Sequence, residues 1–490
     1  KKKSELGAAY KVLVALVALF ALTVRLLRLD HFSFWLDEIM QASFIRGTWS
    51  ECWGSLKFDA VHPPLDYVID RLFGLLGPTD AARRLCPVVW GTLSILAIGF
   101  LVGRRAGRRA GLLSAVFVAA APFHVRYSQE LRPYSLGLLT FLTALLCLDG
   151  FLRWGGGRRL VVLYLACLAT AYSLYIAAIV LGIAAAAMLI DEARSPDAAR
   201  SRRARRFLLW SPAFLALLFV AYLPWLPVVR VAAGRTPETA APPLSWTRLG
   251  ALFSFYGFAP NEGYAPGAGD LAYAALAATG AFCALRRRGT RFVVIGMVGG
   301  AFVIESLEHV HPHFAVSRHF LPVGIVIPIL AAIAVARLGN RSLLRIGATA
   351  AVVLLVLAGD LHGLRSYFRD GRPDWRPLAR FLNARPAGER IITENAYAQV
   401  CLAYYVEGPY WLRRSHPWTR PLDSVAGDPR AISKFWSPGQ DASLVLVHAG
   451  SQSPALKEWA RPFPSLRFPT AEGGAIVKRL DHQIRPAALP

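Results

Sequence analysis

Residues 8–29 read AAYKVLVALVALFALTVRLLRL, and a few positions later the stretch FWLDEIM occupies residues 34–40. The first stretch has about the twenty apolar residues that a helix needs to cross a bilayer. Lys1 to Lys3 precede it and no small-residue cleavage site follows, so we expect a retained first helix with its N-terminus inside. Asp37 and Glu38 are then two adjacent carboxylates just beyond a membrane span, on its outer side.

The composition of the whole chain agrees with a membrane protein. The 490 residues are 55% hydrophobic and their mean hydropathy is +0.40, which is too apolar for an ordinary soluble protein. The net charge of +24 comes from arginine clusters between apolar runs and not from one basic, aromatic-studded face. This pattern favours the cytoplasmic loops of a polytopic membrane protein over a nucleic-acid surface, and we expect no nucleic-acid partner.

Ten further apolar segments follow the first helix and give about eleven predicted transmembrane helices. They occupy residues 84–103, 110–124, 134–153, 159–173, 174–191, 207–230, 271–286, 291–305, 318–337 and 343–361. The arginine clusters between them then share the side of Lys1, as the positive-inside rule requires. Counting the charged run 65–76 as a span would break this agreement, so we expect a juxtamembrane helix there, lying on the membrane surface.

The predicted fold class is mainly α, with a second small domain of mixed α/β type. The transmembrane domain covers residues 1–362 and includes a first outer loop over 30–83. A second outer loop over 231–270 is rich in Gly, Pro and aromatic residues, which is typical of a lid or an acceptor groove. Hydropathy falls beyond Gly363, and residues 363–490 are expected to form a soluble α/β domain outside the membrane.

The pair Asp37 and Glu38 has two interpretations. Either residue can cap a short helix at the membrane surface, where carboxylates suit the positive end of the helix dipole. Alternatively Asp37, flanked by Trp35 and apolar residues, is a catalytic base, and Glu38 orients it, binds a metal with it or caps a helix.

The outer segment RYSQELRPY at 126–134 is the second candidate for chemistry. Arg126 and Arg132 run against the positive-inside bias, and the planar donor fork of arginine matches phosphate oxygens. The alternative is an internal ion pair between Glu130 and one of these arginines. Arg318 and His319 repeat the pattern at the start of a later span, and His62 before Pro63 adds a possible donor.

A metal site is the weakest candidate. His309, His311 and His313 alternate on an outer loop, but Pro312 interrupts the segment, and Asp37 is a further possible ligand. A divalent metal is therefore left open, and no other cofactor is expected. The chain has no Gly-rich nucleotide fingerprint, no P-loop and no nucleophile elbow, so a cytosolic nucleotide substrate has no recognisable site.

Five motifs, in this order, resemble those of a known family: FWLDE, VHPPLDY, RYSQELRPYS, SRHFLP and DWRPLARFL, which begin at residues 34, 61, 126, 317 and 374. The chain resembles the bacterial branch of the dolichyl-phosphate-mannose protein mannosyltransferases, which belongs to the GT-C superfamily of membrane glycosyltransferases with the lipid A aminoarabinose transferase.

The resemblance implies an inverting transfer of a hexosyl or pentosyl group from a polyprenyl-phosphate donor on the outer face of a bacterial inner membrane. The acceptor would be a protein, glycolipid or polysaccharide hydroxyl. The family's acidic residue falls on Asp37 as base, next to Glu38. Substrate binding would fall to the following residues: His62, Arg126, Tyr127, Glu130, Arg132, Tyr134, Arg318 and His319. A carrier or flippase for an anionic lipid-linked substrate, and a non-catalytic membrane scaffold, are the alternatives.

Overall fold

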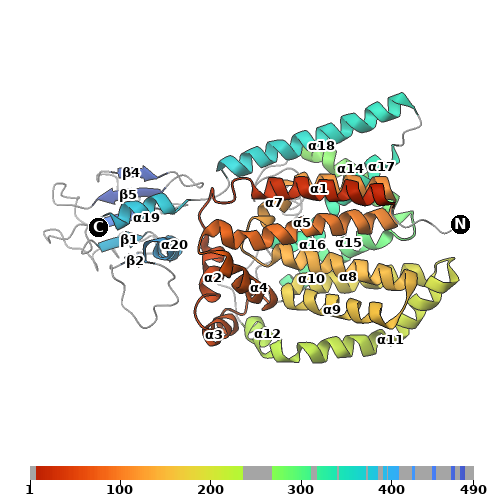
Figure 1. Cartoon of the computed structure of the whole chain (residues 1–490), viewed down its shortest axis with the longest axis horizontal. Coiled ribbons are helices and arrows are strands. Elements are labelled where there is room, and N and C mark those ends of the chain that lie inside the picture. Colours follow the sequence, from red (N-terminus) through yellow and green to blue (C-terminus); the bar gives the residue numbers. More distant parts are fainter. Residues whose placement is uncertain are drawn as a thin grey trace. The chain divides into compact units, whose positions relative to one another are not determined.

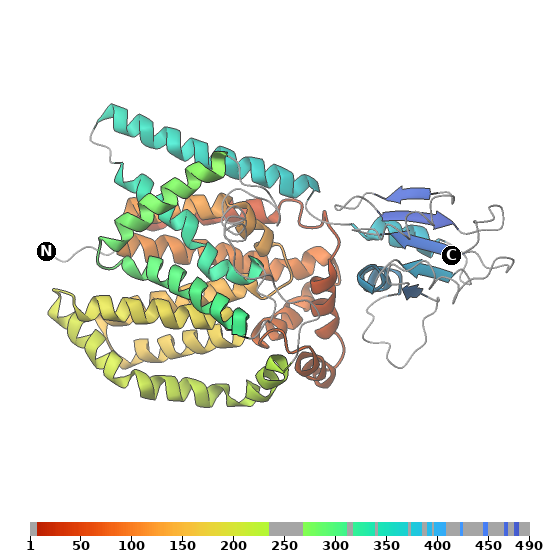
Figure 2. The same ribbon diagram turned by 180° about the vertical axis from the view of Figure 1, so that it is seen from behind.

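The computed structural model of the chain is drawn from two opposite sides in Figures 1 and 2. The residues that the structure describes are 7–234, 268–310, 317–338, 342–370, 374–384, 390–393, 396–407, 422–424, 444–448, 465–468 and 475–479. Most of the predicted outer loop 231–270 lies outside these residues, as do His311 and His313.

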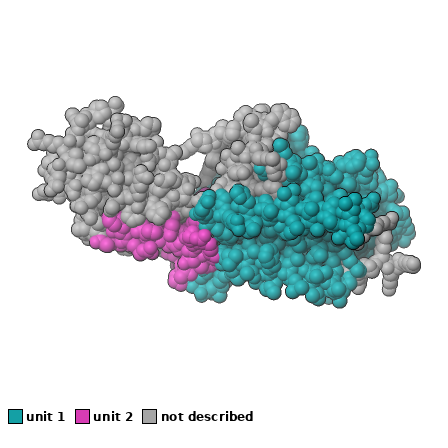
Figure 3. Space-filling model, turned by 90° about the horizontal axis from the view of Figure 1, so that it is seen from above, with its two compact units in different colours: residues 1–27, 54–77, 82–369 teal, residues 28–53, 78–81, 370–490 magenta. Residues whose placement is uncertain are grey.

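The chain divides by its internal contacts into two compact units, coloured in Figure 3. Unit 1 comprises residues 1–27, 54–77 and 82–369, and unit 2 comprises residues 28–53, 78–81 and 370–490. The predicted first outer loop, 30–83, is therefore shared between the two units. The two units are described separately below.

Unit 1 is a helical bundle, and each of the eleven predicted spans contains a helix. The helices are α1 (Ala8–Leu26), α4 (Leu65–Phe73), α5 (Asp80–Arg105), α6 (Arg108–Ala120), α7 (Pro122–Ser128), α8 (Tyr134–Trp154), α9 (Gly157–Ser173), α10 (Tyr175–Ala193), α11 (Ala198–Tyr222), α12 (Leu226–Ala233), α14 (Ala268–Leu285), α15 (Arg291–Val310), α16 (Leu321–Gly324), α17 (Val326–Arg337) and α18 (Leu343–Asp370). Helix α3 (Trp49–Asp59) leads into the unit, and short 3-10 turns lie at Gly74–Leu76, Leu223–Trp225 and Ser317–Phe320.

Seven of the helices in the described part of the chain are long and apolar enough to cross a membrane, and an eighth span results if α6 and α7 are counted together. The predicted number of eleven is not reached by this measure, because segments such as α9, with 17 residues, are short. Helices α6 and α7 are bent by 66° relative to each other. The bend falls at Pro122, whose ring has no N–H to continue the helical hydrogen bonds.

Helix α17 lies at the centre of the bundle. In the span that contains it, 89% of the residues in the most apolar window are buried, compared with 11% in α11 and in α18. Figures 1 and 2 show α11 and α18 on opposite sides of the bundle, where their apolar faces suit contact with lipid. Helix α14 packs closely on α17, because a Cβ built on Gly280 would lie 1.9 Å from the carbonyl oxygen of Leu330.

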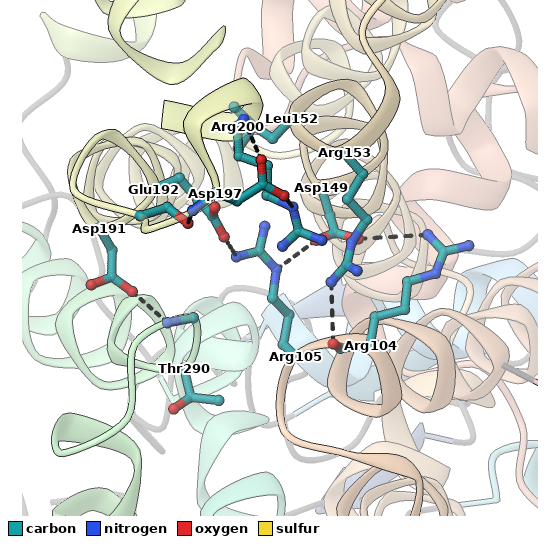
Figure 4. Close-up of polar contacts among 12 residues, drawn as sticks. Arg104, Arg105, Asp149, Leu152, Arg153, Asp191, Glu192, Asp197, Arg200 and Thr290 are labelled. Carbon is teal, nitrogen blue, oxygen red and sulfur yellow. Dashed lines mark hydrogen bonds and ion pairs between the residues drawn. The ribbon is translucent and has the colours of Figure 1, made fainter. Parts of the chain in front are cut away.

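A buried ion-pair network joins α5, α8 and α10 at the arginine-rich end of unit 1 (Figure 4). Arg105 Nε lies 2.6 Å from Asp149 Oδ1, and Arg105 Nη1 lies 2.6 Å from Glu192 Oε1. Arg153 Nε donates to Asp149 Oδ2 at 2.8 Å. Charges withdrawn from water are stable only when paired in this way, so the network fixes how the three helices meet.

Unit 2 combines helices with a five-stranded mixed sheet. Its helices are α2 (Leu36–Phe44), α19 (Arg376–Asn383) and α20 (Ala396–Glu407), and its strands are β1 (Arg390–Thr393), β2 (Leu422–Ser424), β3 (Leu444–His448), β4 (Ser465–Phe468) and β5 (Ala475–Arg479). The strand order is β2-β1-β3-β5-β4. Strand β1 is parallel to both β2 and β3, and β5 is antiparallel to β3 and β4.

Candidate functional site

Three sequence motifs that are far apart in the chain meet in unit 1. The ring of His62 lies 5.9 Å from the ring of Tyr134 and 6.1 Å from the ring of His319, measured between centroids. The rings of Tyr134 and His319 are also 6.1 Å apart, and Tyr127 packs on Tyr134 at 5.4 Å. The segments VHPP, RYSQELRPY and SRHF therefore contribute to one cluster, as expected for a shared site.

His62 lies in the middle of this cluster and is only 4% exposed. Its Nε2 atom is buried and has no hydrogen-bond partner among the residues that the structure describes. Burial lowers the pKa of His62 well below 6.5, and the positive charges of Arg132, His319 and Arg318 lower the pKa further. Burial and the neighbouring positive charges therefore keep the imidazole neutral.

Arg132 and Arg318 give the cluster its charge. Arg132 is 6% exposed and Arg318 is half-buried, and both act on the pKa of His62. Arginine keeps its charge in such surroundings and offers several donors in one plane. Two arginines around a neutral histidine form a small region that suits an anion.

Gln129 holds the segment 126–134 in place. Its side-chain nitrogen donates to the carbonyl oxygens of Arg25 at 2.8 Å and Leu27 at 2.9 Å, at the end of α1. Its side-chain oxygen accepts a hydrogen bond of 3.0 Å from the hydroxyl of Tyr367 in α18. One amide therefore fixes the loop against the first and the last helix of the bundle, and the sequence alone gave no sign of this role.

Arg126 takes part in an ion pair with Glu130. Its Nε lies 3.4 Å from Glu130 Oε1, and the glutamate side chain is only 1% exposed. This is the internal ion pair that the sequence left open as the alternative to a phosphate contact. Arg126 thus compensates a buried carboxylate in its own segment.

Helix α4 contributes residues that the sequence analysis did not propose for the site. Asp66, Tyr67 and Asp70 are at most 2% exposed. Burial raises the pKa of the Tyr67 hydroxyl well above 10. The nearby charge of Arg132 lowers this pKa, and the charges of Asp59 and Asp66 raise it. The amphipathic pattern of 65–76 gave the helix correctly, but two of its charged side chains face the protein interior.

Asp37 and Glu38 lie in the first turn of α2, in unit 2. The backbone N–H of Trp35 donates to Glu38 Oε2 at 3.4 Å, so Glu38 caps the start of the helix. Glu38 is fully buried, whereas Asp37 is half-buried. The cap that the sequence offered as one role of the pair is therefore made by Glu38.

Contacts within unit 2 fix the start of α2. The backbone N–H of Phe34 donates to the Tyr405 hydroxyl at 2.6 Å, and that hydroxyl donates to Asp80 Oδ2, also at 2.6 Å. The backbone N–H of Trp375 donates to Ser33 Oγ at 2.9 Å. Residues just before Asp37 are thus held by α20 and by the segment that precedes α19.

No group of three His, Cys, Asp or Glu side chains in the described part of the chain is placed to hold a metal ion. His309 belongs to α15, but its side chain is outside that part, as are His311 and His313. Asp37 has no further metal-ligand candidates grouped with it among the described side chains.

Comparisons with known proteins add a family match and a fold. Residues 61–226 match the model of the family described as dolichyl-phosphate-mannose-protein mannosyltransferase. No curated protein sequence matches the chain.

Solved structures of ArnT from Cupriavidus metallidurans are similar over nearly the whole length. The apo structure matches with a TM-score of 0.59 and 15% identity, covering 97% of this chain and 99% of that chain. The structure bound to undecaprenyl phosphate matches with a TM-score of 0.57 and 14% identity, covering 96% and 98%. The Archaeoglobus fulgidus oligosaccharyltransferase in complex with zinc and sulfate gives a TM-score of 0.49 at 10% identity, covering 95% and 72%. The family match and the shared fold agree with the resemblance indicated by the five motifs: the chain is a multi-pass membrane protein with the fold of ArnT.

Proposed function

We propose that the chain is an inverting glycosyltransferase that moves a sugar from a polyprenyl-phosphate donor to an acceptor hydroxyl on the extracytoplasmic face of the cytoplasmic membrane. The observation that carries the proposal is the cluster of the buried His62 and Arg132 with the half-buried Arg318 in a GT-C fold. The structurally similar ArnT has been solved with undecaprenyl phosphate bound, which supports a donor of this class.

In this proposal Arg132 and Arg318 hold the phosphate of the donor, and His62 Nε2 makes a hydrogen bond to it. The two arginines stabilise the negative charge of the phosphate, and the buried Nε2 atom of His62 gains a hydrogen-bond partner. Tyr127, Tyr134 and His319 form the aromatic wall against which the sugar or the first isoprene unit packs. Arg126 and Glu130 support this segment through their ion pair.

Asp37 is the proposed base. Its carboxylate takes the proton of the acceptor hydroxyl while the hydroxyl oxygen forms a bond to the anomeric carbon. The bond between the anomeric carbon and the phosphate oxygen breaks, and the electron pair leaves with polyprenyl phosphate. The developing negative charge is stabilised by Arg132 and Arg318, so the leaving group needs no proton. Glu38 keeps α2 capped and so positions Asp37 in this scheme.

We infer that both the site and the C-terminal unit lie outside the cytoplasm, because the arginine clusters between the spans are expected on the cytoplasmic side. The acceptor is a hydroxyl of a protein, a glycolipid or a polysaccharide of the cell envelope. The sequence contains no recognisable motif for binding a soluble nucleotide sugar, which favours a donor that reaches the site through the membrane.

The test is turnover by the purified full-length chain in lipid nanodiscs. A panel of polyprenyl-phosphate sugars is offered with a crude envelope acceptor, and released polyprenyl phosphate is measured. We expect release with one donor class, and we expect Asp37→Asn to bind that donor but to abolish release. Asp30→Asn is the matched control, since Asp30 is exposed and pairs with Arg376.

A chain that releases no polyprenyl phosphate from any donor, with a competent acceptor present, would contradict the enzyme proposal. Transbilayer movement of the lipid by the Asp37→Asn variant, without turnover by the wild type, would instead identify a flippase. If neither Asp37→Asn nor Arg132→Gln changes any of these measurements, the chain acts as a scaffold.

A further inference from the structure

A positively charged cavity lies at the other end of unit 1, away from the His62 cluster. It has a volume of about 290 Å³, and four arginines line it: Arg108, Arg109, Arg287 and Arg337. The span that begins at Arg318 ends at Arg337, and its 20 residues correspond to about 30 Å of helix. The cavity is therefore about one membrane thickness away from the His62 cluster and forms a separate site.

The arginines come from three different parts of the bundle. Arg108 and Arg109 start α6, Arg287 follows α14, and Arg337 ends α17. Arg287 Nη1 donates to the carbonyl oxygen of Ala106 at 2.8 Å, and Arg109 Nη2 donates to Thr349 Oγ1 at 3.1 Å. Each of these hydrogen bonds uses one of the five N–H donors of a guanidinium group, so both side chains are held in place with donors left for a ligand.

Among the residues that the structure describes, no carboxylate lines the cavity. The carboxylates of α8 and α10 are engaged elsewhere: Asp149 and Glu192 pair with Arg105 (Figure 4). Asp191 accepts from the Gly289 N–H and pairs with Arg291. The first turn of α6 is part of the lining, and the positive end of its dipole adds to the potential. No acid in the described part of the cavity wall therefore balances the charges of Arg109, Arg287 and Arg337.

Apart from Thr290, the rest of the wall is largely apolar. Ile333 and Ala336 of α17 and Cys283 of α14 line the cavity together with the arginines. A cavity with cationic groups and an apolar wall, formed at the ends of membrane helices, matches a phosphate group attached to a hydrocarbon chain better than it matches a fully hydrated ion.

We propose that this cavity binds the phosphate headgroup of an anionic membrane phospholipid. The phosphate contacts Arg287 and Arg337, and the glycerol and upper acyl carbons pack on Ile333 and Ala336. Because the positive-inside rule places these arginines in the cytoplasm, the lipid comes from the inner leaflet. This site is distinct from that of the proposed glycosyl donor, and its failure would leave the donor site unaffected.

Native mass spectrometry of the full-length chain in detergent provides the test. Dioleoylphosphatidylglycerol is the probe, dioleoylphosphatidylcholine is the neutral lipid for comparison, and inorganic phosphate is the soluble competitor. We expect one site with a preference for phosphatidylglycerol. Arg337→Gln is expected to weaken it about fivefold, and the pair Arg287→Gln and Arg337→Gln roughly 25-fold.

Two further variants separate a formed site from diffuse charge. Ala336→Phe fills the cavity, leaves every arginine in place and is expected to weaken binding at least tenfold. The pair Arg202→Gln and Arg206→Gln removes the same charge from exposed positions of α11 that do not line the cavity, and is expected to have no effect. If the Ala336→Phe variant does not fold, the Arg337→Gln variant still tests lipid binding at the cavity, because Arg337 is exposed.

Two outcomes would overturn the proposal. Equal losses of affinity in the α11 pair and in the cavity pair would mean that the lipid responds only to net charge. Displacement of phosphatidylglycerol by millimolar inorganic phosphate, with phosphate binding alone at the same site, would assign the cavity to a soluble phosphate compound.

Discussion

Replacing Arg132 by glutamine is the most direct test of the proposed donor site. The side chain is 6% exposed and its charge acts on the pKa of His62, so it lies in surroundings from which water is largely excluded. A hydrogen bond to a charged partner in such surroundings is worth about 1.5–3 kcal/mol, which corresponds to roughly 10- to 150-fold in the dissociation constant of polyprenyl phosphate. Because the arginine also stabilises the leaving phosphate, kcat is expected to fall by a further factor of about 100.

The assay combines equilibrium binding of labelled polyprenyl phosphate in nanodiscs with the rate of its release from the donor. Arg132→Lys keeps the charge but loses the planar donor fork, so we expect an intermediate loss. Arg206→Gln is the matched control, because it removes one charge from an exposed position of α11. Wild-type affinity and turnover in a folded Arg132→Gln variant would refute the assignment of the phosphate to this cluster.

Three further predictions concern stability, each followed by thermal unfolding of the chain in detergent. Because the pKa of His62 is below 6.5 in the folded protein, the unfolded chain binds more protons below about pH 6.5, and stability falls there by up to about 1.4 kcal/mol per pH unit. In His62→Gln we expect a shallower fall over that window, and an unchanged slope would show that His62 is protonated in the fold. Asp149→Asn leaves Arg105 and Arg153 partly uncompensated in a buried site and should cost roughly 3 kcal/mol, whereas Asp197→Asn, at a half-exposed helix cap, should cost well under about 1 kcal/mol. Gly280→Ala places a methyl group 1.9 Å from the Leu330 carbonyl oxygen and should separate α14 from α17 at a cost of about 1–3 kcal/mol, while Gly182→Ala, with nothing within 4 Å, should be neutral or stabilising. Equal losses of stability in Asp149→Asn and Asp197→Asn, or in Gly280→Ala and Gly182→Ala, would contradict the packing described above.

The positions of the helices could be predicted from the sequence because the length of an apolar run is a local property. The break between α6 and α7 could not, since Pro122 lies inside an apolar run that reads as one span over 110–124. In the C-terminal unit, β1, β3 and β5 were predictable, because the sequence pattern indicates strands at residues 389–393, 443–448 and 475–480, close to the observed bounds. Strand β2 was not, because Leu422–Ser424 is three residues long and its pairing with β1 depends on partners elsewhere in the chain.

The residues of the candidate site could be predicted from the sequence more readily than their arrangement in space. Arg132, Arg318 and His62 stood out because polar donors on an outer loop run against the charge bias of the sequence. Their convergence depends on packing between helices that are distant in the chain, which no local pattern contains. The run 65–76 was expected to lie on the membrane surface, yet Asp66 and Asp70 are buried, because an amphipathic pattern gives the two faces of a helix but does not say which one meets other protein.

The Gln129 side chain has a consequence for the order in which the protein is made. Its contacts with the end of α1 can form once the third span has entered the membrane, but its partner Tyr367 is 238 residues further along the chain. At about 5–20 residues per second of synthesis, the loop waits for roughly 10 to 50 seconds before its last hydrogen bond can form. A nascent or truncated chain that lacks α18 therefore carries the loop 126–134 without this bond, and the loop is completed only when the final membrane helix arrives.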